Sequence, residues 1–89
     1  MKAWQWITVI GSTRPTWQLR DGRGRDRATI WQTSDGKFTW HTWDENGTGG
    51  ENWTQGTLED AKRHAVASLV LQGWAPGGWR VEWNREAGA

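Results

Sequence analysis

The stretch RATIWQTSDGKFTWHTW, residues 27–43, decides the fold of this protein. Two runs rich in β-branched and aromatic residues flank the dipeptide Asp35-Gly36, and Asp-Gly between two such runs is a strong signal for a two-residue hairpin turn. A two-residue or a four-residue turn pairs Ser34 with Lys37, whereas a three-residue bulged loop would shift the register and exchange the faces of one strand. We therefore expect an antiparallel hairpin here, in the two-residue register.

The two-residue register assigns each side chain of this hairpin to a face. It pairs Trp31 with Trp40 and Thr33 with Phe38. Aromatic pairs across two strands contribute about 0.2–1 kcal/mol each beyond burial, so we expect the face with Trp31, Phe38 and Trp40 to be the core side. The other face then carries Ala28, Ile30, Gln32, Lys37, Thr39, His41 and Trp43, and a neighbouring strand adds Gln18 and Arg20.

Two further strands are expected before this hairpin. Residues 3–10 (AWQWITVI) have apolar side chains in both alternation phases, so both faces of that strand are expected to be covered. Residues 16–20 alternate cleanly, with Trp17 and Leu19 on the core side. The segment 21–26 (DGRGRD) has the composition of an exposed loop that separates the second and third strands.

The chain after the hairpin is expected to hold a loop, one helix and a last strand. Residues 44–56 (DENGTGGENWTQG) are rich in Gly and Asn and predict a long loop around Trp53. Thr57 has the sequence context of an N-cap, and Gly73 that of the residue just after a helix. The apolar stripe of this helix consists of Leu58, Ala61, Ala65 and Leu69, and the alternating residues 79–83 predict a strand with Trp79 and Trp83 toward the core.

Composition restricts the architecture. A chain of 89 residues is expected to form one domain over residues 1–89, and without cysteine neither a disulfide nor a thiolate zinc site stabilises the fold. Ile, Leu and Val together number 11 and Trp alone numbers 10, so the core has to be largely indole. The expected fold is α+β: an antiparallel meander of four to five strands with one helix packed across one face, in the order β-β-β-β-α-β.

Charge and hydropathy exclude other classes. The net charge of +1 removes the general attraction expected of a dedicated duplex-DNA binder. No apolar run approaches the roughly 18 residues of a membrane span, and residues 1–12 lack the apolar core of a signal peptide. We therefore expect a cytoplasmic protein with no membrane association.

Two short stretches resemble known proteins. DGKFTWHTWDENGTGG (35–50), followed by GTLEDAKRHAVASL (56–69), resembles the central part of small uncharacterised phage and prophage proteins, in which a Trp-rich hairpin precedes a G-T-L-x-x-A-K helix. TQGTLEDAKRHA (54–65) resembles the helix entry of the HicB antitoxin domain. The first resemblance rests on 30 of the 89 residues and the second on 12. The first implies a small accessory protein from a mobile element, and it implies no catalytic residues.

Residues for catalysis or metal binding are scarce. The chain has His41 and His64 but no Cys or Tyr, and Ser12 lies in a turn that does not resemble a nucleophile elbow. Two histidines on separate elements lack metal-ligand spacing, and the acids of residues 44–51 do not follow a calcium-loop pattern. We therefore expect no catalytic residue, no metal and no cofactor.

The polar face of the predicted sheet is the first candidate binding surface. It combines Trp43 with Arg20, Lys37 and His41, and Asp26 is its one acid. Such a face can stack an unpaired base and hold phosphate, as single-strand nucleic-acid binders do. It can equally dock a protein, because Trp and Arg are typical of interface hot spots. A structural alternative is that Trp43 only shields its strand and packs on Arg20 by a cation–π contact.

The predicted acidic loop around Trp53 is the second candidate. Residues 35–60 hold six acids and one Lys, whereas residues 14–27 hold five Arg and two Asp. Solvated opposite edges of the domain explain this asymmetry, although an acidic loop can also mimic phosphates and dock on a basic partner. We expect a non-enzymatic domain that binds a protein through the Trp43 face or the Trp53 loop, with single-stranded nucleic-acid binding as the alternative.

Overall fold

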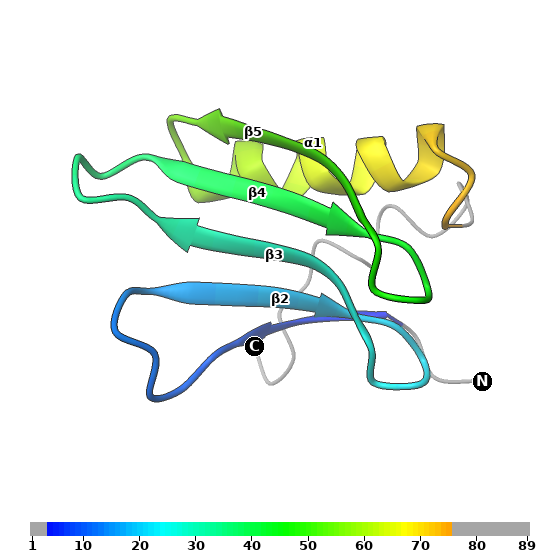
Figure 1. The fold of residues 1–89 in the computed structure, drawn as a ribbon. Helices are drawn as coiled ribbons and strands as arrows, with labels where there is room; N and C mark the ends of the chain where they lie inside the picture. The colour runs from blue at the N-terminus through cyan, green and yellow to red at the C-terminus, as the bar shows by residue number, and fades with distance from the viewer. Residues whose placement is uncertain (1–3, 76–89) are drawn as a thin grey trace.

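The computed structural model describes residues 4–75 and shows an α+β fold of five strands followed by one helix (Figure 1). The class agrees with the sequence prediction, but the order differs, because a fifth strand precedes the helix. The predicted strand over residues 79–83, with Trp79 and Trp83, lies outside the described residues. The elements are β1 (Gln5–Thr8), β2 (Thr16–Arg20), β3 (Asp26–Gln32), β4 (Phe38–Trp43), β5 (Gly49–Gln55) and α1 (Leu58–Leu71).

The five strands form one antiparallel meander. Their order in the sheet is β1-β2-β3-β4-β5, so each strand pairs with its neighbours in sequence. After β5 the chain turns into α1, which lies across one face of the sheet and packs on β3, β4 and β5 (Figure 1). Within residues 4–75, no element covers the opposite face and no strand pairs with the outer edge of β5.

The β3–β4 hairpin has a three-residue loop instead of the predicted two-residue turn. The Thr33 N–H donates to the Lys37 carbonyl at 2.8 Å, and the Gly36 N–H donates to the Thr33 carbonyl at 3.0 Å. Gly36 has a φ of 84°, the left-handed conformation that a bulged loop of this length requires and that glycine adopts without strain. The Asp-Gly signal therefore located the turn correctly but did not fix its length.

The longer loop shifts the hairpin register by one residue. Ile30 pairs with Trp40, and Trp31 pairs with Thr39. Because side chains alternate between faces, this shift moves each side chain of β3 to the face opposite the predicted one. Trp31 therefore lies on the face opposite the helix, and its predicted place on the core side is wrong. The side chains of Ala28, Ile30 and Gln32, predicted on that face, instead share the helix side with Phe38 and Trp40.

Residues 49–55 form a strand, where the sequence predicted part of a long loop. The hairpin loop before it closes on Gly47, which has a φ of 85°. A bulge interrupts the pairing of β4 with β5, and the Thr42 hydroxyl satisfies both backbone groups of Glu51 there, at 3.1 and 3.3 Å. Only Trp53 and Thr54 favour a strand by propensity. Pairing with β4 thus overrides a local sequence that is rich in glycine.

The core lies between α1 and the helix side of the sheet. Trp6, Leu19 and Ile30 are fully buried, and Trp40 keeps 5% of its surface exposed, which confirms the predicted burial of Trp40. Trp17 is only partly buried and packs against this core. Burial of large indole and aliphatic side chains supplies most of the stabilising free energy of such a domain, at about 25 cal/mol per Å² of apolar surface.

The helix begins and ends where the sequence predicts. The Thr57 hydroxyl accepts a hydrogen bond from the Asp60 N–H at 3.1 Å, which satisfies one free donor of the first turn. Gly73, with a φ of 74°, ends the last turn. Its N–H donates to the Val70 carbonyl, and the Trp74 N–H donates to the Leu69 carbonyl. The predicted stripe residues Ala61, Ala65 and Leu69 are fully buried. No helix within residues 4–75 is long and apolar enough to cross a membrane.

Two basic side chains belong to the packed interior, which the sequence analysis did not predict. Lys62 is 2% exposed, and its Nζ lies 5.8 Å from the centroid of the Trp6 ring. Its burial against Trp6 makes Lys62 part of the core rather than of the solvent-facing side of α1. Arg27 is also buried, and its guanidinium lies 4.8 Å from the Trp4 ring centroid.

Candidate functional site

The face of the sheet opposite α1, called here the open face, carries polar and aromatic side chains in rows that cross the strands. Adjacent rows are two residues apart along each strand, or about 7 Å. One row holds Ile7, Gln18, Thr29, His41 and Asn52, and the next holds Thr16, Trp31, Thr39 and Thr54. Gln5, Arg20 and Trp43 lie at the end of the face nearest the β2–β3 loop.

The structure separates the predicted binding residues into two groups. Arg20, His41 and Trp43 lie together on the open face. Lys37 closes the β3–β4 hairpin at the far end of that face. Trp53 pairs with Trp40 and therefore points to the helix side of the sheet. The open face and the Trp53 region are thus two different surfaces.

Trp43 is held on the open face by two contacts. Its ring stacks on His41 with centroids 4.2 Å apart and planes 9° apart, and its Nε1–H donates to the Thr29 hydroxyl at 3.1 Å. Arg20, which we considered as a cation–π partner of Trp43, instead donates twice to the side-chain Oε1 of Gln18, at 3.2 and 3.0 Å. Trp43 is therefore less free to meet a ligand than its sequence position suggested.

Gly49 makes room for this aromatic stack. A Cβ atom at that position would lie 2.8 Å from His41 Nε2, closer than side-chain atoms tolerate. His41 Nε2 is buried and has no hydrogen-bond partner within residues 4–75. The imidazole is thus fixed between Trp43 and the backbone of β5.

Asp26 is the acid of the open face. Its carboxylate accepts a hydrogen bond from the Thr29 hydroxyl, while the other oxygen is buried and has no partner among the described residues. Burial disfavours the charged form and raises the pKa of Asp26 to about 6, although the Thr29 hydrogen bond and the nearby Arg20 charge act in the opposite direction. The margin of the open face therefore changes charge just below neutral pH.

Trp31 is the site residue that sequence reasoning missed. It is half-buried in the middle of the open face, on β3, between Thr16 of β2 and Thr39 of β4. The sequence signal that could have revealed it is the triplet Ser34-Asp35-Gly36, which also fits a three-residue bulged loop with glycine in its last position. Trp31 adds a second indole to a face for which only Trp43 was expected.

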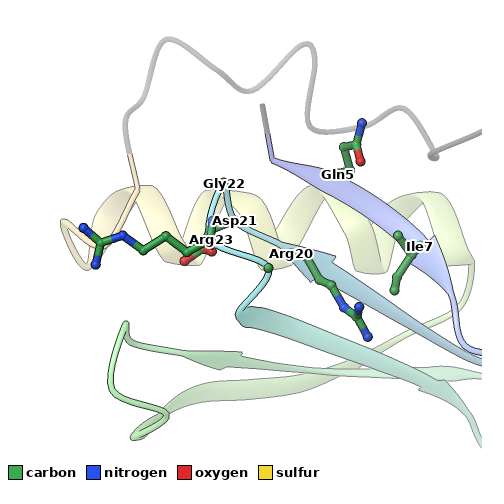
Figure 2. A pocket seen from close by; sticks show the side chains of 7 residues that line it. Gln5, Ile7, Arg20, Asp21, Gly22 and Arg23 are labelled. Atoms are coloured by element: carbon green, nitrogen blue, oxygen red, sulfur yellow. Dashed lines mark hydrogen bonds between the residues drawn. The ribbon is translucent and has the colours of Figure 1, made fainter. Parts of the chain in front are cut away.

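An open pocket of about 640 Å³ adjoins the end of the open face, beside β1 and the β2–β3 loop (Figure 2). Gln5 and Ile7 of β1 line it, together with Arg20 at the end of β2 and Arg23 in the loop. Figure 2 shows the two arginine side chains pointing in different directions. Asp21 also borders the pocket, but its charge is engaged in a buried ion pair with Arg27 at 3.3 Å. The pocket therefore presents mainly positive charge.

The outer edge of β5, called here the β5 edge, is the second surface. Trp53 at its centre is 68% exposed. The N–H and C=O of Glu51 are bonded to Thr42 on the β4 side. Because backbone groups alternate in direction along a strand, those of Trp53 also face β4, and those of Asn52 and Thr54 face outward. Among the described residues, the β5 edge thus combines an exposed indole with backbone donors and acceptors that no other strand pairs.

Within residues 4–75, no group of three or more His, Cys, Asp or Glu side chains is placed to hold a metal ion. No family model, curated protein or solved structure matches this chain. The resemblances to phage proteins and to the HicB antitoxin domain therefore stay predictions. The function has to be argued from the two surfaces themselves.

Proposed function

We propose that this protein is a non-enzymatic interaction domain that binds another protein along the β5 edge, with Trp53 as the anchoring side chain. The observation that carries this proposal is the 68% exposure of Trp53. An indole this exposed contributes little to the core, and Trp is enriched among the residues that dominate binding free energy in protein interfaces. Its cross-strand partner Trp40, by contrast, is buried under the helix.

The backbone of β5 supports binding by strand addition. An exposed sheet edge is a template for pairing with another chain, and peptide recognition by this route obtains affinity from main-chain hydrogen bonds. Natural edges are commonly protected by Lys or Pro, and residues 49–55 contain neither. A partner segment in extended conformation would become a sixth strand beside Asn52 and Thr54.

Charge around the β5 edge favours a basic partner. The nearby cations are largely engaged, since Lys62 is buried and Arg63 lies 3.4 Å from Asp60. Complementary charge accelerates association and sets specificity. Apart from Asp60, which is paired with Arg63, the acids of the preceding loop, of β5 and of the first helical turn are Asp44, Glu45, Glu51 and Glu59.

The resemblance to small phage proteins gives this proposal a biological context. A phage-encoded accessory or inhibitor protein acts by occupying a surface of a host protein, and it needs no catalytic machinery for that role. A cytoplasmic location, which the sequence predicts, is part of the same proposal.

The test compares two exposed apolar side chains. The full chain is immobilised, proteins retained from its host are identified, and the affinity of each purified candidate is measured. We expect Trp53→Ala to lower the affinity for the true partner about 30-fold or more. Leu71→Ala is the matched control, because Leu71 is 85% exposed at the end of α1, and it should leave affinity unchanged.

A backbone variant tests the binding mode. Asn52→Pro removes an outward N–H that the sheet does not use, and edge positions of this kind tolerate proline. We expect this variant to stay folded and to lose binding. A partner that binds wild type, Trp53→Ala and Asn52→Pro with equal affinity would contradict the proposal.

A further inference from the structure

We infer that the open face binds single-stranded nucleic acid, with unpaired bases stacked on its aromatic side chains and phosphates held by cations at both ends of the face. This surface lies across the sheet from the side chain of Trp53. The inference therefore stands independently of the proposed protein partner.

Aromatic side chains provide the stacking platform. Trp31 is the largest side chain of its row, where its neighbours are threonines. The second aromatic surface is the half-buried ring of Trp43, which stacks on the enclosed His41 in the row next to that of Trp31. Stacking of a base on an aromatic ring needs an unpaired base but little sequence specificity. Two aromatic surfaces for base stacking on one face suit a flexible single strand.

Cations lie at both ends of this aromatic region. Arg20 and Arg23 border the pocket at one end, and Lys37 lies at the opposite end, in the β3–β4 loop. At that opposite end, Arg14 lines a second pocket of about 410 Å³ with residues of the same loop. A phosphate backbone that crosses the face would meet positive charge before and after the stacked bases.

Few acids oppose these cations. Among the described residues, the charge of Asp21 is engaged by Arg27, and Glu45 of the β4–β5 loop lies beside Arg25. Asp26 on the face and Asp35 in the hairpin loop then remain against Arg14, Arg20, Arg23 and Lys37. The excess of positive charge is local, because the whole chain carries only +1. A local excess beside aromatic rings fits a short single strand better than a duplex, whose bases are not available for stacking.

The test measures the affinity of the full chain for a labelled oligothymidine, by fluorescence anisotropy at several salt concentrations. We expect binding at low salt that weakens as salt is raised. Trp31→Ala should lower the affinity roughly tenfold or more, while Trp31→Phe retains most of it. Trp53→Ala is the matched control on the helix side and should have no effect.

A second pair of variants tests the phosphate contacts. Arg20→Gln should reduce the slope of log affinity against log salt by about 0.7, the value for one phosphate contact with a single strand. Arg63→Gln removes the same charge from the exposed surface of α1 and should leave the slope unchanged. Because Arg20 is exposed, its variant remains informative even when Trp31→Ala does not fold.

Three results would overturn the inference. The first is absence of oligothymidine binding by folded wild-type protein at low salt. The second is equal affinity for heparin or for duplex DNA, which would show a general attraction for polyanions. The third is self-association that Trp31→Ala abolishes, because the open face would then be covered by a second copy of the chain.

Discussion

Arg27 joins three parts of the fold through one side chain. Its guanidinium donates to the Asp21 carboxylate at 3.3 Å, to the Trp43 carbonyl at 3.1 Å and to the Trp74 carbonyl at 2.9 Å. These contacts connect the β2–β3 loop, the end of β4 and the segment after α1. A planar guanidinium can reach several acceptors at once, which a lysine ammonium cannot do.

We expect Arg27→Met to lower the free energy of unfolding by about 3–5 kcal/mol, because it removes the counter-charge of the buried Asp21 carboxylate and leaves Asp21 Oδ2 and two carbonyls without their donor. Denaturant titration measures the change. Asp21→Asn in the same chain should recover part of the loss, since it removes the uncompensated charge. An unchanged unfolding midpoint for Arg27→Met would show that this network is not formed.

Asp26 predicts a specific pH dependence of stability. The unfolded chain releases the Asp26 proton near pH 3.8 and the folded chain near pH 6, so the folded state binds more protons between these values. The free energy of unfolding contributed by this group therefore falls as pH rises from about 4 to 6. We expect Asp26→Asn to remove that fall and to exceed wild type in stability by about 1 kcal/mol at pH 7.

The control for this prediction is Asp35→Asn, because Asp35 is fully exposed in the hairpin loop and its pKa is lowered, mainly by the Thr33 hydroxyl. Denaturant titrations at pH 4.5 and pH 7 provide the comparison. If the free energy of unfolding depends on pH in the same way in wild type and in Asp26→Asn, the burial of this carboxyl is contradicted.

Trp40 and Trp53 are cross-strand partners with opposite environments. Trp40 is 5% exposed and Trp53 is 68% exposed. We expect Trp40→Ala to cost about 3–5 kcal/mol, as for other buried tryptophans, and Trp53→Ala to change stability by less than about 0.5 kcal/mol. Thermal unfolding followed by circular dichroism measures both. Equal destabilisation by the two substitutions would mean that Trp53 is part of the core.

At the scale of the elements, the two faces of α1 differ sharply. Ala65 is fully buried against the sheet, whereas Ala67, two residues later, is exposed. We expect Ala65→Phe to overpack this contact and to cost about 1–3 kcal/mol, and Ala67→Phe to be nearly silent. If a denaturant titration shows a larger loss of stability for Ala67→Phe than for Ala65→Phe, the face of α1 that contacts the sheet is assigned incorrectly.

The helix was predictable because its signals are local. An N-cap threonine, small and apolar residues at helical spacing and a glycine after the last turn act within one segment, and Thr57, Ala65 and Gly73 behave as expected. Strands were harder because their pairing is not local. The one-residue difference in the β3–β4 loop moved Trp31 to the other face, and β5 exists because β4 offers it a partner.

At the scale of the whole molecule, the helix covers one face of the sheet, so the described chain presents two separate surfaces (Figure 1). Sequence reasoning grouped Arg20, His41 and Trp43 correctly because alternation within one strand survives an error in the pairing of its neighbour. It could not identify Trp31 as part of that group, since this depended on the loop length. It singled out Trp53, but as a loop residue.

The account depends most directly on the β5 edge being free to accept another strand. Hydrogen exchange of individual backbone amides, measured by NMR on the free protein, tests this without knowledge of the partner. The amides of Trp53 and Gln55 face β4 and should exchange slowly, whereas those of Asn52 and Thr54 face outward and should exchange nearly as fast as in an unfolded chain. Equal protection of all four amides in the free protein would show that the β5 edge is already paired, and would contradict the proposed binding site.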